Sequence, residues 1–174
     1  MGTLGRMSTY DEVYAGLARD FPTLAEPALR CEALKRVAHD EANLRRYPEA
    51  AWAAGELVAL LADRKIREAV VDLPDHDHAA FTILGFIQCL EGRIDEAAVS
   101  LQRSIGTGST PMLATFGPSM RLARELLVQG RRTEVLEYLD ECRLIWERGD
   151  AILDRWEEEI REGRIPDFGA NLVY

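Results

Sequence analysis

Residues 75–78 read Asp-His-Asp-His and are the strongest candidate for an active site in this sequence. Imidazole nitrogens and carboxylate oxygens are both metal ligands, so one interpretation of this segment is a metal site. The other is structural, because an Asp at the start of a helix caps free N–H groups and interacts favourably with the helix dipole. The residue types alone leave both interpretations open.

The sequence contains a second His-Asp pair, His39-Asp40, and two such pairs are a feature that can be compared with known metal-dependent enzymes. The two pairs resemble those of the HD phosphohydrolase family, which implies a metal-dependent hydrolase whose ligands lie on helices. That family needs a further His and a distant Asp, and three His in the whole chain do not complete such a set. We therefore expect no metal, no other cofactor and no catalytic residues.

Two other features that could carry chemistry have simpler explanations. Cys31, Cys89 and Cys142 are far apart, lack the paired spacing of zinc or redox sites, and each falls in an apolar helical pattern. They are expected to be buried side chains in a reducing compartment. The segment 106–110, Gly-Thr-Gly-Ser-Thr, faintly resembles a phosphate-binding loop, but it lacks the following Lys and comes after a predicted helix instead of a strand.

The overall charge narrows the class of partner. The net charge of −9 argues against nucleic acid, whose phosphates attract Lys and Arg, and against an anionic membrane surface. An acidic protein is steered toward a basic partner, although acidity also simply maintains solubility. The first seven residues contain no apolar run typical of a signal peptide, and no stretch is long enough to span a bilayer, so we expect a cytoplasmic protein.

Helical periodicity runs through the whole chain, and no segment alternates as a strand does. Pro and Gly residues separate the helices, with Pro27 and Pro48 at helix starts and Gly92 and Gly130 at turns. Between the predicted helices lies a loop over 106–118 that is either functional or contains a helical turn of its own. The expected helices cover 8–20, 48–61, 66–73, 95–105, 118–129, 133–146 and 150–162, together with one that begins at 27 and one that ends at 91. The expected caps are Ser8 for the first helix, Asp75 or Asp77 for the helix that ends at 91, and Asp150 for the last. Pro74 is expected to end the helix 66–73, and residues 157–159 are expected to form a solvated face.

One hairpin carries a recognisable repeat pattern. Its positions are Phe81, Leu84, Gly85, Gly92, Ala97 and Leu101. The pattern resembles a tetratricopeptide repeat, in which an aromatic residue, a Leu-Gly pair, a turn Gly, an Ala and a large apolar residue recur at fixed offsets. The next hairpin repeats it less faithfully, with Leu122, Ala123, Gly130, Val135 and Leu139. Small Gly85 and Ala97 would allow close helix approach.

The resemblance implies an all-α single domain of antiparallel helical hairpins stacked as a short right-handed superhelix. We divide residues 1–174 into degenerate hairpins at 1–76, two repeats at 77–146, a capping helix at 150–163 and an apolar tail at 164–174. In tetratricopeptide arrays the first helix of each hairpin lines a concave groove. By matching offsets, the groove would receive Thr82, Phe86, Met120, Arg124 and Leu127, and Phe86 is expected to be exposed unless the third helix or the long loop covers it.

The tail contains Phe168, Leu172 and Tyr174 and is too apolar for an idle terminus. We expect it to dock on the helices, in competition with a partner that Phe168 and Tyr174 could otherwise contact. The sequence thus favours a non-enzymatic adaptor or chaperone that holds a peptide or helix. An antitoxin-type or immunity-type inhibitor that masks a basic protein is the alternative.

Overall fold

The computed structural model describes residues 2–23, 25–106 and 108–172, with side chains from residue 9 onward. Over these ranges the chain is helical and contains no strand, which confirms the all-α class. The helices are α1 (Gly2–Asp20), α2 (Glu26–Asn43), α3 (Tyr47–Leu61), α4 (Arg64–Ala69), α5 (Leu73–Leu90), α6 (Ile94–Arg103), α7 (Pro111–Phe116), α8 (Arg121–Val128), α9 (Arg132–Ile145) and α10 (Asp150–Arg161), followed by a 3-10 turn, η1 (Gly169–Leu172).

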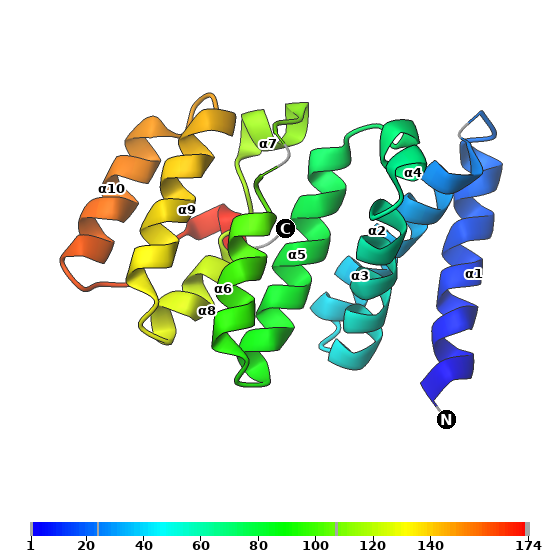
Figure 1. The fold of residues 1–174 in the computed structure, drawn as a ribbon, viewed down its shortest axis with the longest axis horizontal. Coiled ribbons are helices and arrows are strands. Elements are labelled where there is room, and N and C mark those ends of the chain that lie inside the picture. Colours follow the sequence, from blue (N-terminus) through cyan, green and yellow to red (C-terminus); the bar gives the residue numbers. More distant parts are fainter. Residues whose placement is uncertain (1, 24, 107, 173–174) are drawn as a thin grey trace.

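The helices stand side by side in an elongated array that runs from α1 at one end to α10 at the other (Figure 1). Short turns join α2 to α3 and α5 to α6, and these two pairs pack most extensively. Helix α5 is central, because it also packs against α2, α3 and α8. After α10 the chain returns toward the middle of the array, where η1 lies (Figure 1).

Several helix boundaries differ from those expected. Helix α1 already contains Ser8, so Ser8 is not its cap. Pro74 lies in the first turn of α5 instead of ending α4, because a first-turn residue has no intrahelical N–H bond to lose. The caps of α5 and α10 are Asp72 and Gly149, neither with a side-chain bond, instead of Asp75, Asp77 or Asp150.

The sequence left two possibilities for the loop over 106–118, a functional loop or a helical turn within it. The structure shows a helical turn there, because the segment contains helix α7. Thr110 caps this helix through its hydroxyl, which accepts a hydrogen bond from the Leu113 N–H. Helix α7 therefore begins at a defined point in a segment whose Gly and Pro content suggested irregular structure.

Gly85 and the two turn glycines act as the sequence predicts. Gly92 and Gly130 adopt φ of +77° and +80°, the left-handed conformation that ends a helix without strain in Gly. A Cβ at Gly85 would lie 2.3 Å from Leu122 Cδ2 and 2.9 Å from Ser100 Cβ. Helices α5, α6 and α8 therefore meet closely only because position 85 has no side chain.

We predict that Gly85→Ala lowers the free energy of unfolding by about 1 to 3 kcal/mol, measured by urea denaturation followed by circular dichroism. Alanine is the better helix former, so the loss must come from overpacking against Leu122. Gly55→Ala, whose Cβ would meet nothing within 4 Å in α3, is the control and should be neutral or stabilising. A stabilised Gly85→Ala variant would contradict the close packing.

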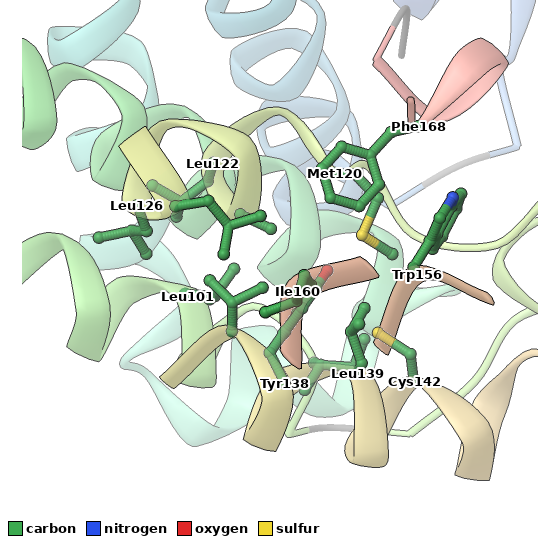
Figure 2. Packing of buried hydrophobic residues seen from close by; sticks show 14 of the residues in the cluster. Leu101, Met120, Leu122, Leu126, Tyr138, Leu139, Cys142, Trp156, Ile160 and Phe168 are labelled. Carbon is green, nitrogen blue, oxygen red and sulfur yellow. The ribbon is translucent and has the colours of Figure 1, made fainter. Parts of the chain in front are cut away.

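The core has two large parts that meet at α5. The first lies between α2, α3 and α5 and includes Leu34, Leu57 and Ile83. The second joins α6, α8, α9, α10 and the tail, and Figure 2 shows its tightly packed side chains. The ten residues labelled there are Leu101, Met120, Leu122, Leu126, Tyr138, Leu139, Cys142, Trp156, Ile160 and Phe168.

Helix α10 covers this second part, and one of its carboxylates corrects the sequence analysis. Glu157 was expected on a solvated face, but its side chain is only 7% exposed. It pairs with Arg143 of α9 at 2.5 Å and with Arg161 at 2.9 Å. The two guanidinium groups compensate a carboxylate that burial would otherwise destabilise.

The tail docks on the array, as expected for the part that the structure describes. The Asn171 side-chain amide donates to the Phe116 and Pro118 carbonyl oxygens at 3.1 and 3.0 Å, and the Met120 N–H donates to the Asn171 carbonyl at 2.7 Å. Phe168 is 1% exposed, with its ring centroid 4.9 Å from that of Trp156. The tail therefore fixes the segment that connects α7 to α8.

Candidate binding cleft

Three of the four residues at 75–78 connect α5 to separate parts of the array. Asp75 Oδ1 accepts a hydrogen bond from the Thr110 hydroxyl at 2.5 Å, which holds the start of α7. Asp77 is buried and pairs with Arg67 of α4 at 3.1 Å. His76 Nε2 lies 3.3 Å from Glu32 Oε2 of α2, close enough for attraction although not aligned for a hydrogen bond.

The fourth, His78, is buried, and both of its ring nitrogens have partners. Its Nδ1 lies 3.1 Å from the Ser104 carbonyl oxygen, and its Nε2 accepts a hydrogen bond from the Ser119 N–H at 2.9 Å. These partners fix a neutral tautomer with the proton on Nδ1. Burial lowers the pKa of His78 to about 4, although the Ser104 carbonyl partly opposes the shift. In this arrangement His78 has no lone pair left for a metal ion.

The other candidates for metal binding or nucleophilic chemistry are His39 and the three cysteines. Within the described residues, no three His, Cys, Asp or Glu side chains come together in a way that could hold a metal ion. His39 is near Asn43, with 3.2 Å between Nδ1 and Nδ2. The three cysteines are buried, and burial raises the pKa of Cys31 and of Cys89 to about 11, so both remain thiols instead of nucleophilic thiolates.

A cleft of about 590 Å³ opens between α2, α5 and the segment around α7. Most of its surface is apolar, and two large side chains one helical turn apart stand over it, with Met112 58% and Phe116 54% exposed. Such paired exposure is unusual for large apolar residues. The lining residues are Lys35, Arg36, His39, Asp40, Asp75, His78, Ala79, Met112, Leu113, Phe116, Gly117 and Ser119.

The basic side chains on the α2 wall are held by one carboxylate. Glu32 lies 2.7 Å from Lys35 Nζ and 3.1 Å from Arg36 Nε. Burial alone would raise the pKa of Glu32, but His76, Lys35 and Arg36 outweigh it and lower the pKa to about 2. The carboxylate therefore stays ionised at neutral pH and positions both cations beside the cleft.

A smaller cavity of about 80 Å³ continues from the cleft and shares His39, His78, Ala79 and Ser119 with it. Phe86 lies here and is only 8% exposed. Its ring is 5.9 Å from the Tyr47 ring of α3, and the Arg121 guanidinium lies 4.2 Å from its centroid. Of the two alternatives for Phe86, exposure is therefore wrong and cover by the third helix is confirmed, because Tyr47 of α3 lies against the ring, with Arg121 of α8 over it.

No protein-family model, curated protein or solved structure matches this chain. The role of the cleft is therefore inferred from its own residues. In the described part of the chain, no helix combines the length and apolar character needed to cross a membrane.

The structure separates the seven residues predicted to bind a partner. Thr82 and Phe86 line the inner cavity together with Leu172 of the tail. Arg124 is on the surface and pairs with Glu125 at 3.1 Å. Three of the others, Met120, Leu127 and Phe168, are core residues at 0%, 5% and 1% exposure, so they cannot meet a partner in this conformation. Tyr174 lies outside the described residues.

Sequence reasoning missed the main wall of the cleft. Met112 and Phe116 are apolar residues in a segment rich in Gly, Ser, Thr and Pro, and their spacing of four is a signal that one helical face carries both. Lys35, Arg36 and Ala79 gave no such signal. Their place in the cleft depends on how α2 and α5 pack, which no local pattern encodes.

Proposed function

We propose that this protein is a non-enzymatic interaction module that holds a segment of another protein in the cleft between α2, α5 and α7. The observation that carries the proposal is the exposure of Met112 and Phe116 over an apolar cleft of about 590 Å³. Burying two such side chains under a partner releases water from both surfaces and supplies the main driving force for binding. No nucleic acid or membrane is part of the proposal.

The occupant we propose is a short extended segment with apolar side chains. The protein's own tail supports this choice, because residues 164–168 have no regular structure and lead into η1, where Asn171 docks on the same α7–α8 connection through backbone and amide hydrogen bonds.

We also propose that the hairpins stack in the manner of tetratricopeptide repeats. The left-handed turns at Gly92 and Gly130 and the close approach at Gly85 support it. An adaptor or chaperone in the cytoplasm fits three free, buried cysteines. The bonding of Asp75, Asp77 and His78 to other elements supports a role other than catalysis.

Selection from a random displayed-peptide library tests the proposal. We expect the protein to enrich peptides that share an apolar pattern and that fail to bind the Met112→Asp, Phe116→Asp double variant. Val99→Asp is the matched control, because Val99 is 59% exposed on α6 and lies outside the cleft. Absence of enrichment, or equal binding to the double variant, would refute peptide binding at this cleft.

A second candidate, an inhibitor that masks a basic protein, is favoured by the outer face of α9. Glu137, Asp140 and Glu141 are exposed there, none forms an ion pair with a described residue, and Leu144 is 78% exposed beside them. If a native partner binds here, replacing the three acidic residues with Lys should abolish binding, and added salt should weaken it strongly. Loss caused only by the cleft variant would exclude this candidate.

A further inference from the structure

We propose that the inner cavity is a binding site for a small carboxylate with a short apolar chain. Nothing in this proposal requires that the neighbouring cleft bind a peptide. It rests on two polar groups that line one small cavity and lack full partners, Thr82 and Arg121, and on the apolar character of the remaining wall.

Thr82 supplies the first observation. The residue is 6% exposed, and its Oγ1 is buried and forms no hydrogen bond. A buried hydroxyl without a partner is costly, and the great majority of buried polar groups in proteins are satisfied. Because Thr82 lines the cavity, an oxygen atom of a bound ligand could accept the hydrogen bond that the protein leaves unmade.

Arg121 supplies the second observation. Its guanidinium stacks on Phe86 at 4.2 Å, and its one hydrogen bond, to Asn43 Oδ1, is long at 3.4 Å. Among the described residues no carboxylate pairs with it, whereas Lys35, Arg36 and Arg124 nearby each have an acidic partner. A stacked guanidinium keeps its N–H edge available for planar, bidentate bonding to an anion.

The rest of the wall defines the chemical class of the ligand. Ala42, Ala79, Ile83 and Leu172 surround the cavity with apolar surface, and His39 and Asn43 complete its polar side. The volume of about 80 Å³ admits only a few non-hydrogen atoms. A carboxylate fits better than a doubly charged phosphate, because removing a second charge from water into an apolar cavity costs more free energy.

Titration of the full-length protein with propionate, butyrate and isovalerate, followed by two-dimensional NMR, tests the site. We expect at least one acid to bind saturably with a Kd below about 10 mM, within reach of so few atoms, and to shift signals of Thr82 and Phe86. Its primary amide should bind at least about tenfold more weakly, because a charge-assisted bond is lost.

Variants localise the binding. Arg121→Gln should weaken the acid at least about tenfold, and Thr82→Val by about fivefold, the value of a neutral hydrogen bond. Arg124→Gln, on the same helix but paired with Glu125, is the control and should bind normally. Saturable binding by none of the acids, equal binding of acid and amide, or normal binding by a folded Arg121→Gln variant would each overturn the proposal.

Discussion

Phe168→Ala is expected to lower the free energy of unfolding by about 3 to 5 kcal/mol, the cost of truncating a buried aromatic residue. The ring is 1% exposed and packs edge-on against Trp156, whose own Nε1 donates to the Asp167 carbonyl at 3.2 Å. The substitution removes a side chain that joins the tail to α10. Urea denaturation followed by tryptophan fluorescence and circular dichroism measures the loss.

The control for this prediction lies three residues earlier in the same tail. Ile165 is 45% exposed, so Ile165→Ala should change the free energy of unfolding by less than about 1 kcal/mol. If both variants lost the same small amount, the tail would not belong to the folded core. The docked position of Asn171 against Phe116 and Pro118 would then also be in doubt.

The second large effect is a loss of stability in mild acid that His78 causes. The folded state holds the pKa of His78 at about 4, whereas an unfolded His titrates near 6.5. Between these values the unfolded state binds the proton and the folded state does not, so stability falls as pH falls. From pH 7.5 to 4.5 we expect a loss of about 2 to 3 kcal/mol from this residue.

Urea denaturation at several pH values measures this loss. The range stops at pH 4.5 because the lowered pKa of Glu32 adds its own acid-dependent loss mainly below that point. His78→Gln should be less stable than the natural protein at pH 7.5 but should lose much less on acidification. His39→Gln, at a half-exposed His, is the control and should keep the steep dependence. If the free energy of unfolding of the natural protein changed little between pH 7.5 and 4.5, that result would contradict a buried, neutral His78.

Local sequence patterns were sufficient to predict most of the helices. Pro27 and Pro48 lie in the first turns of α2 and α3, and Gly92 and Gly130 follow the ends of α5 and α8, because these residues have conformational preferences that hold in any context. The close packing at Gly85 could also be expected, since a small residue on an apolar helix face permits contact.

The candidate site could not be predicted in the same way, because its parts come together only in three dimensions. Phe86 looks exposed on its own helix, yet Tyr47 and Arg121 cover it from segments about 40 and 35 residues away. His78 looks like a metal ligand until Ser104 and Ser119 occupy its nitrogens. Glu157 sits in a run of three glutamates, and only Arg143 of α9 makes its burial possible.

The most direct test of the central claim is the affinity of a library-selected peptide for four versions of the protein, measured by isothermal titration calorimetry. The natural protein and Val99→Asp should bind equally. Met112→Asp should bind at least about tenfold more weakly, and the Met112→Asp, Phe116→Asp double variant about a hundredfold or more, because two apolar contacts are replaced by buried charge. Equal affinities for all four folded proteins would contradict a partner-binding cleft between α2, α5 and α7.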